Sequence, residues 1–291
     1  MNNFPHLAAR VFNRPVAIHP QKAEIIVSAI ADRLGVSRIV GGNHDFQSLS
    51  FGNLQTSEQA FGEGDPNDRG YDAVGGVAVI PVRGTLVHRL GYLRSYSGMT
   101  GYDGIRQAFF AALADPAVKA IAFDIDSPGG EVAGAFDLSD EIFAARGIKP
   151  LWAILDESAY SAAYAIASAC DQITVPRTGG TGSIGVVCMH VDYSKAIEQA
   201  GITVTLIQYG EHKTDGNEYM PLGAAQKQIQ NEVNEVGEMF VSTVARNRNV
   251  SVSRIRSTQA ACFMGQDGVA AGLADAVMPP DAAFRQLVQQ L

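Results

Sequence analysis

Hydrophobic and polar positions follow two different periods through residues 74–277. Short blocks rich in β-branched and other apolar residues predict strands, and longer blocks with apolar residues three and four apart predict amphipathic helices. The expected strands are 74–84, 118–125, 151–155, 172–175, 184–190 and 203–209, and the expected helices are 103–114, 132–145, 161–169, 193–199 and 224–246. Because strands and helices alternate, we expect right-handed crossovers and an α/β fold with a mainly parallel sheet.

This pattern places the candidate functional residues at the ends of strands. Residues 118–125 are apolar almost throughout, which is typical of a strand covered on both faces, and they lead into Asp126-Ser-Pro-Gly-Gly130. The strand 151–155 leads to Ser161, which opens a helix of small residues. Ligands of parallel sheets bind beyond the carboxyl ends of the strands. The pattern therefore places Gly129, Gly130 and Ser161 at the ligand-binding edge.

The two ends of the chain differ from this central block. Residues 21–34 place apolar side chains on one helical face, whereas residues 41–72 are polar and glycine-rich without sustained periodicity. The long helix expected at 224–246 has apolar residues at helical spacing, which indicates core or subunit packing. We therefore divide the chain into an N-terminal helical arm (1–40), a flexible polar linker (41–72), a main domain (73–280) and a C-terminal tail (281–291).

Composition narrows the class of protein. The 291 residues are 46% hydrophobic and 18% charged, which is enough to bury a core. With 22 basic and 30 acidic residues the net charge is −8, so nucleic acid is not expected as a partner. No apolar run reaches the roughly 18 residues that span a bilayer, and the N-terminus lacks the apolar stretch of a signal peptide. We expect a soluble intracellular protein without a membrane anchor.

Single residues carry little chemistry by themselves. A serine at a helix start, such as Ser161, is more often an N-cap than a nucleophile, although helix N–H groups would stabilise an anion beside it. Gly129-Gly130 lets backbone N–H groups approach a substrate oxygen, but a tight turn explains the same residues equally well. Lys213 stands in a loop, where a lone lysine is usually solvated.

No metal site is expected. Asp124 and Asp126 stand on one strand, and no histidine stands at ligand spacing from them. His212, next to Lys213, is expected to point elsewhere. The three cysteines, at positions 170, 188 and 262, are far apart in apolar or small-residue surroundings, so we expect buried thiols and no ligands.

Four ordered motifs together resemble a known family. They are Asp126-Ser-Pro-Gly-Gly130, the Ser161 helix ending in Ala-Cys-Asp171, Thr181-Gly-Ser-Ile-Gly185, and Gly210-Glu-His-Lys213. In this order they resemble the signal peptide peptidase A family of serine proteases, over about residues 74–275. Within it, the chain is most similar to the head-maturation proteases of lambda-type tailed phages, the capsid protein C group. The stretches that carry this second likeness are 95–102, 132–137, 212–217, Phe4-Pro-His-Leu-Ala and Phe12-Asn-Arg-Pro.

The resemblance implies a Ser-Lys catalytic dyad in residues 73–280. Ser161 would be the nucleophile, Lys213 the general base, and Ser183 the residue that orients the lysine amine. The backbone N–H groups of Gly130 and Ala162 would form the oxyanion hole.

The resemblance also implies how substrate binds. The fold would be that of Clp proteases and crotonases, with repeated β-β-α units. An extended peptide would lie beside the strand edges at Gly129 and Gly130, in a protein that forms homo-oligomers. The base must be a neutral lysine, whereas an unperturbed lysine has a pKa near 10.4. Burial in a poorly hydrated cleft would lower that pKa, and the reaction needs neither metal nor cofactor.

Two departures from the family are visible. Cellular members usually show Ser-Gly-Gly, whereas this chain has Ser161-Ala162-Ala163. Alanine still donates its N–H in a helical first turn, so we expect activity with a slightly narrower pocket. The lambda-type proteases continue into a scaffold segment, and we expect scaffold on a separate chain or already removed.

The functional hypothesis is a phage or prophage head-maturation protease. It would degrade scaffold protein inside the assembling procapsid, in the host cytoplasm, beside capsid and portal proteins. Three alternatives remain: a cellular peptidase that clears signal peptides, a crotonase-like acyl-CoA enzyme, and a catalytically silent capsid component. The last would hold Lys213 too far from Ser161 to hydrogen-bond.

Overall fold

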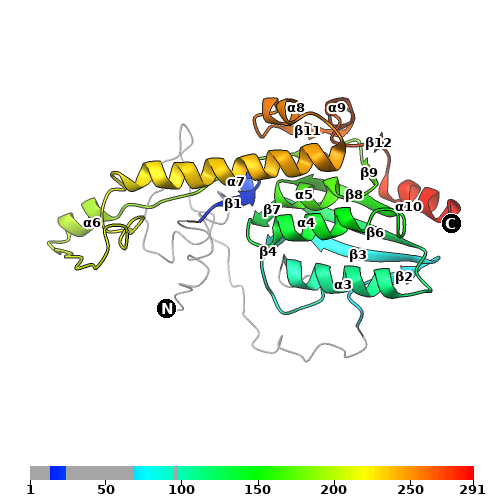
Figure 1. Ribbon diagram of the computed structural model, residues 1–291, viewed down its shortest axis with the longest axis horizontal. Helices are drawn as coiled ribbons and strands as arrows, with labels where there is room; N and C mark the ends of the chain where they lie inside the picture. The colour runs from blue at the N-terminus through cyan, green and yellow to red at the C-terminus, as the bar shows by residue number, and fades with distance from the viewer. Residues whose placement is uncertain (1–13, 24–67, 95–97) are drawn as a thin grey trace.

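A mainly parallel sheet lies at the centre of the fold (Figure 1). The computed structural model describes residues 14–23, 68–94 and 98–291. In those residues the sheet has the main order β11-β10-β8-β6-β3-β2, with β9 also paired to β8 and β12 paired to β9. Its strands are β2 (Asp72–Val74), β3 (Val77–Arg83), β6 (Ala120–Ser127), β8 (Leu151–Tyr160), β9 (Gln172–Val175), β10 (Gly180–Gly182), β11 (Cys262–Met264) and β12 (Ala276–Val277). Antiparallel pairing occurs at β2–β3 and β10–β11, so the predicted α/β class with a mainly parallel sheet is confirmed.

Alternation along β6 explains how this sheet is covered on both faces. Phe123 belongs to a large core between the sheet and three helices, whereas Ala122 faces a smaller core that Leu287 helps to close. Successive side chains of a strand point to opposite faces, so one apolar block serves both cores. The helices of the first face are α3 (Tyr102–Ala114), α4 (Ala135–Ala144) and α5 (Ala162–Ser168), and the helix of the second is α10 (Pro280–Gln289).

A second, smaller sheet continues from the carboxyl ends of the central strands. Its order is β1-β7-β4-β5, with β1 (Val16–Ile18), β4 (Thr85–Val87), β5 (Met99–Gly101) and β7 (Gly129–Glu131). Gly84 alone separates β4 from β3, and Pro128 alone separates β7 from β6. The smaller sheet therefore stands at the edge where the sequence predicts ligand binding.

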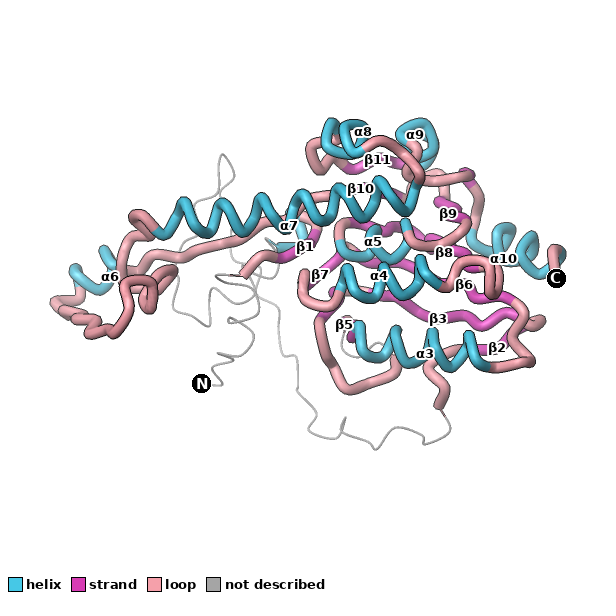
Figure 2. Tube along the Cα trace, in the orientation of Figure 1, coloured by secondary structure: helices cyan, strands magenta, loops and turns pink. Residues whose placement is uncertain are grey.

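A long projection extends from this body (Figures 1 and 2). It comprises residues 188–239 and includes α6 (Ser194–Gln199) and the first part of α7 (Ala225–Arg248). The buried residues of α7 lie almost entirely in its last turns, from Phe240 to Asn247, where the helix packs on α4 and α5. We use "projection" for residues 188–239 and "body" for the remaining described residues. The body also contains α8 (Val252–Ser257) and α9 (Gly265–Ala271).

Two expected strands are wrong. Residues 203–209 form no regular structure; Ile207 is 96% exposed and Tyr209 is fully exposed. Their β-branched pattern suits a strand, but this part of the chain lies on the projection, away from the sheets. Residues 184–190 are not a named strand either, although Val187 forms an isolated antiparallel bridge with Val16. The expected helices 103–114, 132–145, 161–169, 193–199 and 224–246 are confirmed, with ends shifted by up to three residues.

The structure of the two chain ends differs in part from the prediction. Residues 16–18, assigned to a helical arm, form a strand in the smaller sheet. Most of the expected helix at 21–34 and nearly all of the 41–72 linker lie outside the described residues. Residues 281–291, assigned to the C-terminal tail, contribute most of α10, the polar C-terminal helix that the sequence predicts after Asp275, and pack on the sheet through Ala283 and Leu287. Among the described helices, none has the length and apolarity needed to cross a membrane.

Candidate active site

Ser161 lies at a strained corner between β8 and α5. Its φ is 54° and its ψ −123°, a region that residues with a side chain rarely adopt. Its side chain makes no capping hydrogen bond, so the N-cap alternative does not explain the residue. The Ser161 N–H donates to the Gly182 carbonyl at 2.9 Å, and its Oγ lies 3.4 Å from the Gly185 carbonyl oxygen. This corner fixes the hydroxyl at the start of a helix, where the backbone N–H groups favour an anion.

Two glycines let the smaller sheet approach Ser161. A Cβ added to Gly129 would stand 2.9 Å from the Ser161 Cβ, and one added to Gly130 would stand 1.8 Å from the Leu86 carbonyl oxygen. No side chain fits at either position, and the φ of Gly129 is 94°. Gly129 therefore brings backbone against Ser161, Gly130 follows it in β7, and Ala162 follows Ser161 in the chain.

Ser127 holds this glycine corner in place, a role that the sequence analysis missed. Its buried hydroxyl donates to the Gly84 carbonyl at 2.7 Å and accepts the Gly129 N–H at 3.1 Å. One side chain thus ties the ends of β3 and β6 to the backbone beside Ser161. The signal was present in Asp126-Ser-Pro-Gly-Gly130, where a serine two residues before a glycine can bond its N–H.

Ser183, like Ser161, has a positive φ. Its φ is also 54°, it is 5% exposed, and its N–H donates to the Ala261 carbonyl at 2.9 Å. Burial raises the pKa of the neighbouring Cys262 thiol, and a hydrogen bond with the Ser183 side chain partly opposes that shift. Cys262 as a residue is exposed and Cys188 is partly exposed, so the expectation of three buried thiols holds only for Cys170.

Lys213 lies apart from this cluster. It is exposed, and the connection between α6 and α7 to which it belongs is part of the projection (Figure 1). Its N–H donates to the Gly210 carbonyl at 3.2 Å, and its neighbour His212 pairs with Asp215 at 2.9 Å. The structure thus brings together Ser161, Ser183, Gly129, Gly130 and Ala162, and it leaves Lys213 outside the group.

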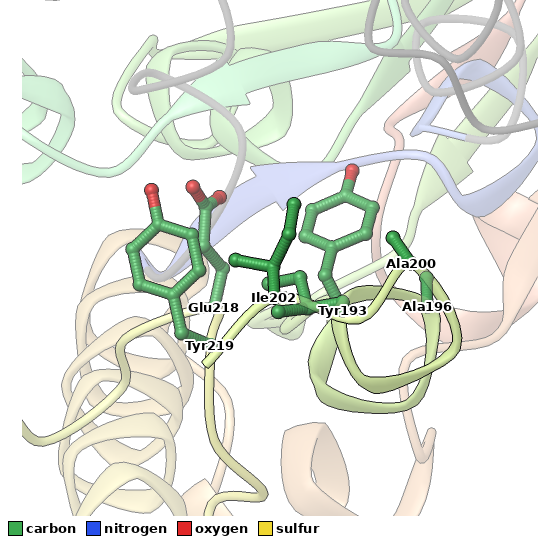
Figure 3. Close-up of a pocket in the computed structure, with 7 residues that line it drawn as sticks. Tyr193, Ala196, Ala200, Ile202, Glu218 and Tyr219 are labelled. Carbon is green, nitrogen blue, oxygen red and sulfur yellow. The ribbon is translucent and has the colours of Figure 1, made fainter. Parts of the chain in front are cut away.

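A pocket on the projection is also separate from Ser161 (Figure 3). Tyr193, Ile202 and Tyr219 line it with apolar surface, and Glu218 stands at its rim. Its lining residues are the α6 N-cap Tyr193, residues of α6 and residues of the chain that follows it. The pocket therefore belongs to the same part of the molecule as Lys213.

Charged groups at the strand ends are paired with one another. The Arg83 guanidinium bridges Asp124 and Asp156, and the hydrogen bond that it donates to Asp124 is the main cause that raises the Arg83 pKa. In the part of the chain that the structure describes, no three His, Cys, Asp or Glu side chains gather as a metal site would require. Asp124 and Asp156 therefore balance the charge of Arg83.

Comparison with known proteins identifies the family. The model of peptidase family S49 matches residues 144–291. The chain is 42% identical, over 99% of its length, to the head-tail preconnector protein GP5 of Enterobacteria phage P21. This chain belongs to peptidase family S49. It is also 39% identical, over 94% of its length, to the capsid assembly protease C of Escherichia phage lambda, and 29% identical over 55% to the chloroplastic serine protease SPPA of Arabidopsis thaliana.

The S49 match confirms the resemblance drawn from the four motifs. It covers Ser161, Ser183 and Lys213 but begins after Gly129-Gly130, which the longer alignments with the two phage relatives include. The aligned regions cover 58% of the P21 protein and 63% of the lambda protein, so the chain matches about three fifths of each.

Proposed function

We propose that this chain is a serine endopeptidase of phage head maturation, which digests internal scaffold protein during procapsid assembly. The observation that carries the proposal is the strained Ser161 corner, enclosed by the Gly129-Gly130 backbone, in an S49 chain. The names of the phage P21 and lambda relatives support the setting. The central parallel sheet with a second sheet at its carboxyl edge is consistent with the fold of Clp proteases and crotonases.

The proposed chemistry uses a Ser161–Lys213 dyad. The neutral Lys213 amine takes the proton of the Ser161 hydroxyl as Oγ attacks the peptide carbonyl. The Gly130 and Ala162 N–H groups stabilise the oxyanion of the tetrahedral intermediate. The lysine then passes its proton to the leaving amine, and water releases the acyl group by the same steps. Ser183 would orient the amine once Lys213 has arrived.

Lys213 must reach Ser161 for this reaction to occur. Either the projection of the same chain moves, or the projection of a second copy supplies the lysine. The exposed apolar side chains of the projection, Ile207 and Tyr209 among them, support its burial in a homo-oligomer. Assembly would also remove water around the amine and so lower its pKa.

The proposed location is the interior of the assembling procapsid. Confinement there would give a high local concentration of scaffold, so a site that binds peptide mainly through backbone would suffice. Capsid and portal proteins would be the neighbours.

A second candidate is a catalytically silent capsid component. The observation that favours it is the exposed position of Lys213, apart from the Ser161 cluster. In this case Ser161 would remain as a structural corner without a base, and assembly would bring no lysine to it.

Digestion of a disordered protein separates the two candidates. Casein is incubated with the assembled wild type, Ser161→Ala and Lys213→Ala at several pH values. The peptidase proposal expects cleavage by the wild type only, with losses of at least about a thousandfold in both variants, and a rate that rises as an amine deprotonates. Lys195→Ala, a second lysine of the projection, is the matched control and should cut normally. Equal cleavage by all variants would contradict the dyad, and a silent wild type would favour the structural role.

A further inference from the structure

A strand from the N-terminal part of the chain lies in the groove beside Ser161. Residues 16–19, which we call the strap, run between β7 on one side and the segment around Val187 on the other. Val16 and Val187 exchange two backbone hydrogen bonds, of 2.8 and 3.0 Å, and the His19 N–H donates to the Pro128 carbonyl at 2.7 Å. The strap is therefore held by backbone on both of its edges.

The register of the strap brings it against the predicted catalytic backbone. Ala17 stands opposite Gly130, and Ile18 stands opposite Gly129. In an antiparallel pair, hydrogen-bonded residue pairs alternate with pairs that are not hydrogen-bonded. His19 and Pro128 form a hydrogen-bonded pair, so Ala17 and Gly130, two residues further along the strands, are also a hydrogen-bonded pair. The backbone of Gly130, proposed as an oxyanion donor, thus faces Ala17.

Two more contacts place the strap next to the nucleophile. A Cβ built on Gly129 would lie 2.3 Å from the Ala17 carbonyl oxygen and 2.9 Å from the Ser161 Cβ. The His19 ring packs on the ring of Tyr160, the residue before Ser161, with the centroids 4.9 Å apart. Ser161 and Ala17 are both 0% exposed. In this arrangement the serine is shut off from solvent and from any peptide.

We propose that the strap occupies the peptide groove of the Ser161 site, and that a scaffold segment enters by taking its place as an antiparallel strand. This inference rests on the proposed function. Adding a strand to exposed backbone edges is a general mode of peptide recognition, and here both edges are already formed. The full burial of Ala17 further indicates that an incoming peptide carries a small side chain opposite Gly130.

The strap is suited to exchange with another peptide. Its strand has only three residues, Val16–Ile18, so few backbone bonds must break for it to leave. While it is seated, the affinity for scaffold is reduced by the fraction of open molecules. A high concentration of scaffold, or contact with a neighbouring subunit, would increase the fraction of molecules in which the strap has left the groove.

A reversible lock tests the proposal. In Val16→Cys/Val187→Cys the two cysteines stand opposite each other, at a spacing of about 5.5 Å between Cα atoms that a disulfide can bridge. Oxidation should abolish casein cleavage, and dithiothreitol should restore it. Each single variant, treated identically, is the control and should respond little to either reagent. Equal cleavage by the oxidised and reduced double variant would overturn the proposal.

A release variant gives the opposite expectation. Ala17→Asp would place a carboxylate in a fully buried position, so the strap should leave the groove. Casein cleavage should then rise on the order of tenfold, whereas Ala17→Ser, the matched control, keeps the strap seated. A lower or unchanged rate in a folded Ala17→Asp protein would contradict the proposal.

A fluorophosphonate separates failure of the strap from failure of the proposed function. Its phosphorus bonds to the oxygen of an activated serine with loss of fluoride. Faster labelling of Ala17→Asp than of the wild type, absent in Ser161→Ala, supports both proposals. Equal labelling of all proteins that retain Ser161 overturns the strap alone. No labelling of any protein removes Ser161 as a nucleophile, and the strap proposal falls with it.

Discussion

The body and the projection are built on different principles, although one peptidase site is proposed to need both. In the body, Ser161 stands on a strained corner whose neighbours are buried in the large core. In the projection, Lys213 stands on exposed chain, and the named helices there bury little. The nucleophile is thus fixed by packing, while the base depends on where the projection lies. A site divided in this way is rigid in one half and adjustable in the other.

The largest expected effect comes from mixing two inactive variants. Ser161→Ala keeps an intact projection, and Lys213→Ala keeps an intact body. If a second copy supplies the lysine, co-assembly should restore up to about a quarter of the wild-type casein cleavage, since both intact halves must meet at one site. Each variant assembled alone is the control. A mixture that stays at background would show that the lysine comes from the same chain.

Adding one methyl group should affect the two regions in opposite directions. In Gly130→Ala the new Cβ would stand 1.8 Å from the Leu86 carbonyl oxygen, so the free energy of unfolding should fall by about 1–3 kcal/mol and cleavage should be lost. In Gly237→Ala the nearest atom is 4.0 Å away, and alanine suits a helix better, so stability should rise by up to about 1 kcal/mol. Chemical denaturation measures both. A tolerated Gly130→Ala would refute the tight packing of the smaller sheet.

The buried end of α7 is expected to depend on one amide. Asn247 donates to Ser139 of α4 at 3.1 Å and to Ser168 of α5 at 3.0 Å. Asn247→Ala leaves both hydroxyls without this donor and should cost about 1–3 kcal/mol of unfolding free energy. Asn231→Ala, an exposed position on the same helix, should change it by less than about 0.5 kcal/mol. Similar losses at both positions would show that α7 is held along its whole length.

The smallest effect concerns titration beside Lys213. The hydrogen bond and charge of Asp215 raise the pKa of the exposed His212 above its ordinary value near 6.5. The pair therefore stabilises the folded state fully below pH 6.5, and this contribution disappears as the pH rises through the raised pKa. An NMR titration should show the raised value in the wild type and about 6.5 in Asp215→Asn. Identical titrations would mean that the pair does not form in solution.

The sequence predicted the long strands of the body and the helices of both regions, but not the conformation of residues 203–209 of the projection, and the reason is periodicity. Residues 118–125 and 151–155 are long apolar blocks whose partners are other long apolar blocks, so pattern alone located them. Residues 203–209 have the composition of a strand, but composition does not supply a neighbouring strand to pair with.

The candidate site was predictable only in part. Gly129, Gly130 and Ser161 follow from motifs at strand ends, which the parallel sheet brings to one edge, whereas Ser183 and Ala162 were predicted only through the family resemblance. β1 and β7 have three residues each, too few to show a period, and they pair across more than a hundred residues. No local pattern in the sequence specifies where Lys213 lies relative to Ser161.

The half-buried α7 acts as a lever. The helix is anchored by its buried stretch from Phe240 to Asn247, and the part that precedes this anchor in the projection, residues 225–239, spans about 22 Å at 1.5 Å per residue. A tilt of about 10° at this anchor would carry the outer end through roughly 4 Å, by the same helical geometry. A change in packing too small to disturb the core can thus determine how far the part of the projection that carries Lys213 moves.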